Sequence, residues 1–263
     1  MKSYVVKLGG HALDTLRPNS EVLVALARDV ETLRDESTHV VIVHGGGPQI
    51  QALLDAVGLE SRFHEGLRVT DEVTVEFVAM ALSQVNLHFV AALNRAGLAS
   101  AGVSGVDGSL LTASALGPPW GRVGAVPKVD CSLIETLWAS GVTPVVSSIS
   151  TDEWGELVNC NADVAAGALA GALQAEALIL LSDVDQLRTD PLDENTSLAL
   201  VTRDDVRRLF DNGSIRDGMR PKMSAALDAL EGGARRVLVA NGTRAHALRD
   251  ALAGSTKSTA VVP

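Results

Sequence analysis

The chain has 263 residues, of which 46% are hydrophobic and 3% aromatic, and its formal net charge at pH 7 is −10. Nucleic acids require a basic surface, so this acidic composition excludes them as the main partner. No apolar run approaches the roughly 18 residues that a membrane helix needs, and the N-terminal sequence is too short and too polar for a signal peptide. We therefore expect a soluble, cytoplasmic protein with no membrane partner, in which Cys131 and Cys160 are reduced thiols.

The first predicted strand, residues 4–8, ends in a lysine and two glycines. Lys7 lies near the end of this strand, and Gly9 and Gly10 follow it. A lysine at this place fits a surface position, but beside paired glycines at the carboxyl end of a strand it more often faces a ligand. We favour the ligand interpretation. A helix capped by Ser20 follows, so the chain opens with a strand and a helix.

A second junction of strand and helix lies in the stretch 40–59, VVIVHGGGPQIQALLDAVGL. Four apolar residues predict a buried strand, and apolar residues at helical spacing follow Pro48. Between them lie Gly45, Gly46 and Gly47. Glycine lets the backbone approach a ligand closely, and a helix N-terminus offers unpaired N–H groups. The junction therefore predicts an anion-binding cradle, although a plain tight turn fits the three glycines equally well.

The middle of the chain continues the alternation of helices and strands. A polar loop at 61–71 carries Arg68, which is either a surface charge or a planar fork for a carboxylate. A long helix follows and extends to about residue 96; its apolar face fits core packing and a subunit contact equally well. Further predictions are strands at 99–103 and 142–147, a glycine-containing turn at 104–108, a hairpin or irregular flap at 113–126 and a helix at 133–138.

Two features of the second half indicate a ligand. Asn159, Asn161 and Asp163 cluster just before or at the start of a small-residue helix, 164–173, and this is more than one helix cap needs. Lys222 lies in the first turn of a later helix, where a positive charge opposes the dipole unless an anion is present. The remaining predictions are strands at 178–181 and 235–240, polar loops at 188–197 and 212–221, helices ending near 210 and 253, and a last edge strand at 259–262.

The alternating elements predict a mostly parallel sheet covered by helices, and ligands bind such sheets beyond the carboxyl ends of the strands. No Ser/His/Asp or Cys/His set, paired carboxylates, CxxC or HExxH spacing stands out, so covalent catalysis, glycoside hydrolysis and a protein-ligated metal are not expected. Two lysines, an arginine, glycine cradles and an Asn/Asp cluster instead suit phosphoryl transfer, in which positive charge surrounds the phosphoryl group and the nucleotide carries Mg²⁺.

Seven motifs resemble those of the amino acid kinase superfamily, and within it the acetylglutamate kinases. They are KLGG at 7–10, VHGGGPQI at 43–50, GLRVTD at 66–71, SGVDG at 104–108, VNCNAD at 158–163, LLSDVD at 180–185 and DGMRPK at 217–222. The resemblance covers nearly the whole chain and implies a three-layer αβα sandwich. Residues 1–150 would form an N-terminal lobe for N-acetyl-L-glutamate binding and dimerisation, and residues 151–263 a C-terminal lobe that binds ATP with Mg²⁺.

The same resemblance implies an activity and a set of site residues. The activity is ATP-dependent phosphorylation of the side-chain carboxylate of N-acetyl-L-glutamate, in arginine biosynthesis. Lys7 and Lys222 would reach the transferring phosphoryl group, and Asp163 would organise both lysines. The other implied contacts are to the substrate from Gly46, Gly47, Arg68 and Asn159, to phosphate from Gly9, Gly10 and Gly45, and to the nucleotide from Ser182, Asp183, Arg188, Ser214, Ile215 and Arg216.

Three positions depart from the family pattern: Gln186 replaces a frequent glycine, Val106 a frequent lysine and Cys160 the usual valine. The substitution at Gln186 affects the nucleotide loop. The sequence also reaches KLGG by residue 7, without the N-terminal helix of arginine-inhibited relatives. We therefore expect a homodimer that is built on the helix at 71–96 and the neighbouring strand, and that is insensitive to arginine.

Other functions stay open at this stage. A related kinase acts on aminoadipate or glutamate linked to a carrier protein, but the GLRVTD loop resembles the enzymes for free substrates. A non-catalytic amino-acid or nucleotide sensor has no need of Lys7, Asp163 and Lys222. A dinucleotide oxidoreductase lacks support because the chain has no GxGxxG motif at a suitable junction.

Overall fold

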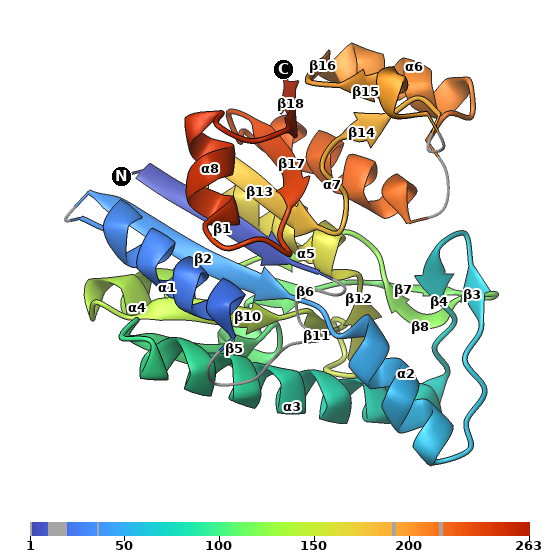
Figure 1. The fold of residues 1–263 in the computed structure, drawn as a ribbon. Helices are drawn as coiled ribbons and strands as arrows, with labels where there is room; N and C mark the ends of the chain where they lie inside the picture. Colours follow the sequence, from blue (N-terminus) through green and yellow to red (C-terminus); the bar gives the residue numbers. More distant parts are fainter. Residues whose placement is uncertain (1, 10–19, 36, 191–192, 216–217) are drawn as a thin grey trace.

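The computed structural model describes residues 2–9, 20–35, 37–190, 193–215 and 218–263. A central eight-stranded sheet lies between two layers of helices (Figure 1). All neighbouring strands are parallel except β17 and β18, so the predicted αβα sandwich is confirmed. The strands, in their order across the sheet, are β16 (Leu200–Thr202), β18 (Ser258–Val262), β17 (Val237–Asn241), β13 (Ala177–Ser182), β1 (Lys2–Leu8), β2 (Thr38–His44), β10 (Thr143–Ser147) and β5 (Ser100–Ser104).

Each face of the sheet has its own hydrophobic core. Helices α1 (Glu21–Leu33), α3 (Glu72–Arg95) and α8 (Ala247–Ala253) cover one face. Helices α4 (Ser132–Ala139), α5 (Ala162–Ala172), α6 (Arg203–Asp211) and α7 (Met219–Glu231) cover the other. Strand β1 shows how the sequence divides between the cores, because side chains alternate along a strand. Val6 and Leu8 pack beneath α1 and α3, whereas Val5 faces α5 and α7. Lys7 shares the face of Val5, which directs its side chain toward α5 and α7.

Smaller strands frame the carboxyl edge of the main sheet. A six-stranded sheet has the order β7 (Ala115–Gly117), β8 (Gly121–Gly124), β12 (Leu157–Cys160), β11 (Ile149–Thr151), β6 (Leu111–Thr112) and β9 (Lys128–Val129). Helix α2 (Gly47–Ala56) follows β2 directly. Two further hairpins are β3 (Phe63–His64) with β4 (Leu67–Arg68), and β14 (Leu187–Arg188) with β15 (Ser197–Leu198).

The structure corrects three expectations about strands. The stretch 61–71, expected to be a plain loop, contains the β3–β4 hairpin, and the loop at 188–197 contains parts of β14 and β15 and a 3₁₀ turn, Glu194–Thr196. Strand β18 was predicted to be the edge strand of the sheet. It is instead the second strand, because β16 pairs with its outer side and forms the edge. The three residues of β16 are too few to give a period in the sequence, and only their distant pairing with β18 makes them a strand.

Helix α3 is the most apolar long helix in the part of the chain that the structure describes. Its length and hydropathy match those of a membrane span, yet 44% of its most apolar window is buried inside the protein. Its N-cap is Asp71, whose side chain accepts a hydrogen bond from the Thr74 backbone N–H. The predicted apolar face is confirmed as core, because all five of its residues are buried: Val75, Val78, Leu82, Val85 and Phe89.

Candidate active site

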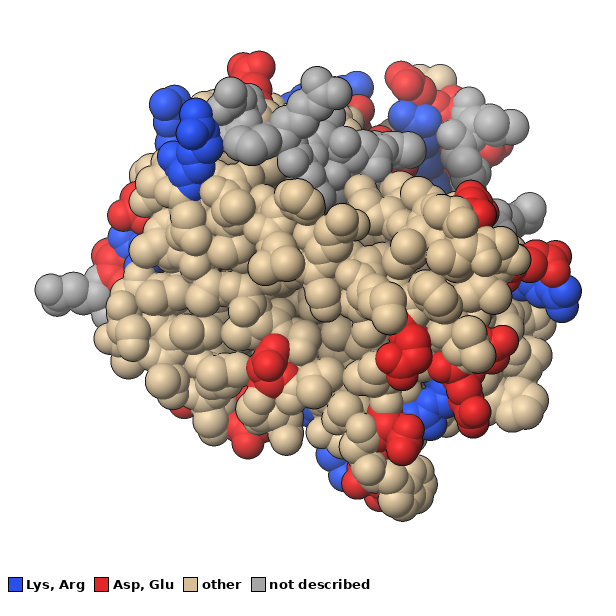
Figure 2. Space-filling model, turned by 90° about the horizontal axis from the view of Figure 1, so that it is seen from below, with Lys and Arg blue, Asp and Glu red and all other residues tan. Residues whose placement is uncertain are grey.

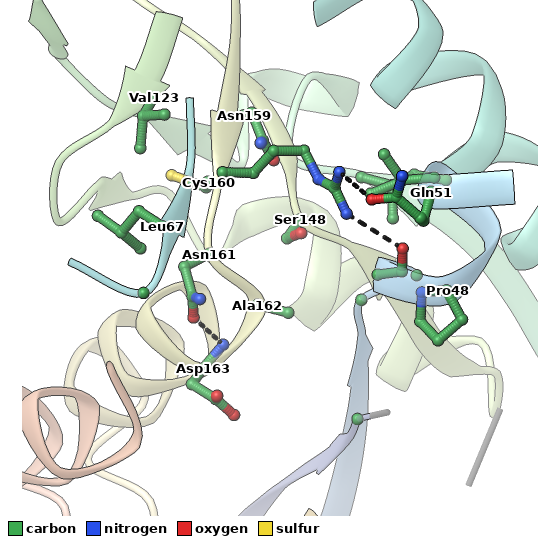
Figure 3. Close-up of a pocket in the computed structure, with 18 of the residues that line it drawn as sticks. Pro48, Gln51, Leu67, Val123, Ser148, Asn159, Cys160, Asn161, Ala162 and Asp163 are labelled. Atoms are coloured by element: carbon green, nitrogen blue, oxygen red, sulfur yellow. Dashed lines mark hydrogen bonds between the residues drawn. The ribbon is translucent and has the colours of Figure 1, made fainter. Parts of the chain in front are cut away.

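A cleft of about 430 Å³ opens where β1 and β2 end at the carboxyl edge of the sheet. Figure 3 shows its lining, to which β12, the start of α5, the start of α2 and the β3–β4 hairpin all contribute. The structure thus brings together residues that lie far apart in the sequence. The predicted site residues that line the cleft are Lys7, Gly9, Gly45, Gly46, Gly47, Arg68, Asn159 and Asp163. Gly10 and Arg216 lie outside the described residues.

One buried carboxylate binds two ammonium groups beside this cleft. Lys7 Nζ lies 2.7 Å from Asp163 Oδ1, and Lys222 Nζ lies 3.1 Å from Asp163 Oδ2. The side chains of Lys7, Asp163 and Lys222 are 7%, 6% and 16% exposed. The three residues that carry the phosphoryl-transfer hypothesis therefore meet at one point. We call them the charged triad.

The start of α5 explains why three Asn and Asp residues cluster in the sequence. Asn161 is the N-cap, and its Oδ1 accepts a hydrogen bond from the N–H of Asp163 at 2.8 Å (Figure 3). It also accepts from the N–H of Val164 at 3.3 Å. Asp163 lies in the first turn, where the helix dipole favours a carboxylate. Asn159, on β12, donates from Nδ2 to Thr70 Oγ1 at 3.0 Å. One residue is thus the cap, and the other two present polar groups to the cleft.

Small residues let α5 and α7 pack closely, and this packing brings Lys222 to Asp163. A Cβ at Gly167 of α5 would lie 2.6 Å from the carbonyl oxygen of Ala225 in α7, which real side chains do not tolerate. Lys222 precedes Ala225 by three residues and so lies on the same face of α7. The glycine in the small-residue helix therefore sets the distance across which the two charges meet.

Burial and charge act against each other in the triad. Burial lowers the pKa of Lys7, although attraction to Asp163 acts in the opposite direction. Burial alone would raise the pKa of Asp163, but the ammonium groups of Lys7 and Lys222 hold it below its usual range. The carboxylate therefore stays ionised at neutral pH. Its two positive partners form a site that an anionic phosphoryl group can enter.

Two of the cleft glycines stand where a side chain would crowd a neighbour, whereas a Cβ at Gly47 would meet no atom within 4 Å. A Cβ at Gly9 would meet Lys7 Nζ, and one at Gly46 would lie 3.1 Å from Leu82 and 3.3 Å from Val85, both on α3. Helix α2 begins at Gly47 with Pro48 in its first turn, so its N-terminal N–H groups and positive dipole end point toward the cleft. This geometry favours the anion cradle over a plain turn.

Arg68 presents a charged fork at the other end of the cleft. Its Nη1 donates to Gln51 Oε1 at 3.0 Å and to Ser61 Oγ, its Nη2 donates to the Gly47 carbonyl at 3.2 Å, and the guanidinium lies 4.7 Å from the Phe63 ring centroid. Only 9% of Arg68 is exposed. Within the described ranges no carboxylate lies in ion-pair contact with it. Burial lowers the pKa of Arg68 while the charge of Asp55 acts in the opposite direction, and the guanidinium can still bind an anionic ligand.

The predicted nucleotide contacts do not line this cleft. Ser182 donates to Asp183 Oδ1 at 2.9 Å, and Asp183 attracts Lys7 electrostatically. Arg188 Nη2 pairs with Glu194 at 3.3 Å, and the Ile215 side chain packs in the core. The backbone N–H of Ser214 donates to Asn212. These five residues lie in the half of the chain that also supplies Lys222, and their nucleotide contacts stay predictions.

The residues that hold Arg68 gave no signal in the sequence. Gln51, which lines the cleft, and Ser61, which does not, belong to a helix and a loop whose meeting is set by the fold. The glycine-containing turn at 104–108 does not line the cleft, because it follows the outermost strand β5. A Cβ at Gly105 would lie 2.5 Å from the Ile149 carbonyl oxygen, so that glycine serves packing.

The three-layer fold and the charged triad together define a class of protein, an α/β enzyme whose cleft handles a phosphoryl group. A sequence profile described as the Amino acid kinase family matches residues 2–241. The chain belongs to this family.

Comparisons with individual proteins show which members of the family this chain is similar to. The acetylglutamate kinase of Synechocystis sp. is 39% identical over 249 residues, which are 94% of this chain and 82% of that protein. The acetylglutamate kinase of Roseobacter denitrificans is 40% identical over 244 residues, 92% of this chain and 83% of that protein. Among solved structures, smu.665 from Streptococcus mutans superposes with a TM-score of 0.79 at 28% identity, covering 91% of this chain and 94% of that one.

Proposed function

We propose that the protein transfers the γ-phosphoryl group of ATP to the side-chain carboxylate of N-acetyl-L-glutamate. The observation that carries this function is the charged triad, in which Lys7 and Lys222 converge on Asp163 beside a glycine-lined cleft. The acetylglutamate kinase relatives support the choice of substrate, at 39% and 40% identity. This reaction is a step of arginine biosynthesis.

The triad supplies the electrostatics of the transfer. The attacking oxygen of the substrate carboxylate forms a bond to the γ-phosphorus while the bond to the β,γ-bridging oxygen breaks, giving an acyl phosphate and ADP. Negative charge is spread over the equatorial oxygens, and Lys7 and Lys222 can neutralise it from two sides. Asp163 holds both ammonium groups in place, and the N–H groups of Gly10 and Gly45 would donate to phosphoryl oxygens. The N–H of Gly9 donates to the Leu181 carbonyl oxygen at 3.1 Å, so Gly9 would serve phosphate binding by the close approach of its backbone.

The substrate would lie between the triad and Arg68. The guanidinium of Arg68 suits the α-carboxylate, because it is a planar donor held by neutral acceptors. Asn159 and the backbone of Gly47 would fix the rest of the substrate, and the backbone N–H of Gly46 would contact the carboxylate that accepts the phosphoryl group. Residues 1–150 would then form the amino-acid lobe, to which β12 adds Asn159 from the other half of the chain.

The nucleotide would occupy the lobe formed by residues 151–263. Ser182 ends β13 at the same sheet edge as Lys7, since Lys7 pairs in register with Leu180. The donor set fits a triphosphate, because ammonium groups and backbone N–H groups converge near this edge. Mg²⁺ would arrive with ATP, and in the described ranges no group of three His, Cys, Asp or Glu side chains forms a metal site. The remaining nucleotide contacts would come from Asp183, Arg188, Ser214, Ile215 and Arg216.

A coupled ADP-release assay tests the proposed function. With ATP and Mg²⁺, N-acetyl-L-glutamate is expected to give a kcat/KM at least about 10²-fold above that of glutamate, aminoadipate or carbamate, because a cleft lacking a partner for the free amine rejects it. Turnover of carrier-linked aminoadipate in preference to N-acetyl-L-glutamate would replace the proposed substrate. No ADP from any acceptor would favour a sensor.

A homodimer is proposed from the outer face of α3. Val73, Met80 and Leu87 are 57%, 57% and 72% exposed, and their spacing of seven residues places them on one stripe of the helix. Figure 2, which views the molecule from the side on which α3 lies in Figure 1, shows a broad surface with few charged residues. The adjacent strand β5 is an edge strand of the main sheet. The α3 helix and β5 strand of a second copy would cover this apolar stripe and the edge strand.

We place this enzyme in the cytoplasm, where its free Cys131 and Cys160 stay reduced.

Leu87→Glu is expected to convert the dimer to a monomer, because a charge in the centre of an apolar contact is left without a partner. Sedimentation should give twice 27.4 kDa for the wild type and 27.4 kDa for the variant. Leu200→Glu is the matched control, since Leu200 is 64% exposed on β16 at the opposite sheet edge. A monomeric wild type, or a dimeric Leu87→Glu variant, would contradict the proposed contact.

A further inference from the structure

A fully buried histidine lies directly behind the glycine cradle, and the transfer chemistry above does not use it. His44 is the last residue of β2, pairs in register with Leu8 and Ser147, and is 0% exposed. Its ring makes two hydrogen bonds. Nδ1 lies 2.9 Å from the Gly45 carbonyl oxygen, and Nε2 lies 2.9 Å from Asn86 Nδ2.

The surroundings of Asn86 determine where the His44 proton lies. Asn86 Nδ2 is also 2.9 Å from the Val145 carbonyl oxygen, which can only accept a hydrogen bond. The amide oxygen lies over Gly102, where a Cβ would collide with it. The amide nitrogen therefore faces His44. It also lies 3.5 Å from the Val103 carbonyl oxygen, at the limit for a hydrogen bond, whereas Nε2 is at 2.9 Å, so the second amide hydrogen is donated to Nε2. Because Nε2 accepts, the ring proton is on Nδ1, and Nδ1–H donates to the Gly45 carbonyl.

The environment also keeps this ring neutral. Burial lowers the pKa of His44 to about 4, and the nearby positive charge of Lys7 acts in the same direction. Phe89 packs edge-on against the ring, with centroids 5.9 Å apart. At neutral pH the imidazole therefore has one donor and one acceptor, and both have partners.

The bond to Gly45 has a consequence on the other side of the same peptide. In a trans peptide the C=O and the following N–H point in opposite directions. Since the Gly45 carbonyl is turned toward His44, the N–H of Gly46 is turned away from it. Gly45 and Gly46 both line the cleft, whereas His44 does not.

We infer that His44 is a positioning residue for phosphoryl transfer: as the Nδ1–H tautomer set by Asn86, it fixes the Gly45–Gly46 peptide so that the Gly46 N–H faces the reacting groups. This inference rests on the proposed function. Helix α3 supports the same peptide from a second direction, because Leu82, one turn before Asn86, and Val85, the residue before it, lie against Gly46. The cradle is thus held by a hydrogen bond on one side and by packing on the other.

The tautomer can be measured on the whole wild-type chain without any assay. Isotope-labelled histidine and long-range proton–nitrogen NMR spectra should show one of the six rings as a neutral Nδ1–H tautomer that does not titrate between about pH 6 and about pH 8. Loss of that signal in the His44→Asn variant assigns it. A neutral Nε2–H ring at His44, or titration near the ordinary value of about 6.5, would overturn the inference.

Two amide substitutions separate the two hydrogen bonds. The Asn side chain of His44→Asn places an amide N–H near the position of Nδ1 and keeps the hydrogen bond to the Gly45 carbonyl. The longer Gln side chain of His44→Gln reaches toward Asn86 and loses the hydrogen bond to Gly45. His44→Asn is expected to keep kcat near the wild-type value. His44→Gln is expected to lower kcat about 10²-fold with little change in KM, as misplacement of a catalytic group by about 1 Å does.

The outcomes of this comparison are distinct from a failure of the proposed function. Equal kcat in the two variants, or losses that follow their melting temperatures, would assign His44 a merely structural role and overturn the inference. If the wild type fails to phosphorylate N-acetyl-L-glutamate, the proposed substrate is wrong, and the NMR measurement still decides the tautomer on its own.

Discussion

Asp163→Asn is expected to lower kcat about 10³-fold and to destabilise the folded protein by about 3–5 kcal/mol. The substitution keeps the shape of the side chain but removes the charge that Lys7 and Lys222 share, at 2.7 and 3.1 Å. Two buried ammonium groups are then left to repel each other, and neither is held toward the phosphoryl group. The ADP-release assay measures the first effect, and thermal or denaturant unfolding measures the second.

The pH dependence of this destabilisation has a definite sign. The pKa of Asp163 is lower in the folded chain than in the unfolded chain. Its stabilising contribution is therefore complete above the unfolded value of about 3.9 and is lost as the pH falls through the folded value. The difference in stability between wild type and Asp163→Asn should thus be largest near neutral pH and should narrow in acid.

Asp228→Asn is the matched control. Burial and the nearby Glu231 raise the pKa of Asp228, which lies on α7 with Lys222. Removing this carboxylate charge should leave stability unchanged or improved, with wild-type turnover. Wild-type turnover by Asp163→Asn would instead show that the carboxylate does not organise the lysines for transfer.

The site residues that the sequence predicted are those whose positions are determined by their immediate neighbours in the chain. Lys7 and Gly9 stand at the end of one apolar run, and Gly45 follows another, so a strand period followed by glycine was enough to place them at a sheet edge. Lys222 was visible because its charge opposes the dipole of its own helix. In each case the residues of one short stretch were enough for the prediction, and the structure places these residues beside one cleft.

The parts that the sequence did not predict depend on contacts between distant segments. Gln51 and Ser61 hold Arg68 across a hairpin that looked like a loop, and Asn86 reaches His44 from 42 positions away. A single Asn inside an apolar helix, or a single Gln on a helix surface, leaves no pattern in the sequence that indicates its partner. The sequence did not predict strand β16 for the same reason, since only its pairing with β18 defines it.

The resemblance to acetylglutamate kinases gave roles that geometry alone does not give. The structure explains why Asp163 can serve two lysines, because Asn161 caps α5 and leaves the Asp163 side chain free for them. The two lysines contact the same carboxylate, Lys7 from β1 and Lys222 from α7. Kinetic measurements on each lysine variant distinguish transition-state stabilisation from ground-state binding.

Lys7→Met and Lys222→Met are each expected to lower kcat by about 10²–10³-fold while changing the KM of either substrate much less, because charge builds up on the phosphoryl oxygens mainly in the transition state. Methionine keeps the length of the side chain and removes the ammonium group. Each variant leaves Asp163 paired with the other lysine, so both should be more stable than Asp163→Asn. Lys128→Met, at an exposed position on β9, is the control and should match the wild type.

The two lysine variants should also differ from each other in a way that the fold dictates. Lys7 is 7% exposed on a central strand, whereas Lys222 is 16% exposed near the start of α7. Binding of ADP should weaken more in Lys222→Met, because the proposed nucleotide lobe carries Lys222. A KM that rises at constant kcat would assign the affected lysine to ground-state binding. Wild-type turnover in either variant would remove that lysine from the mechanism.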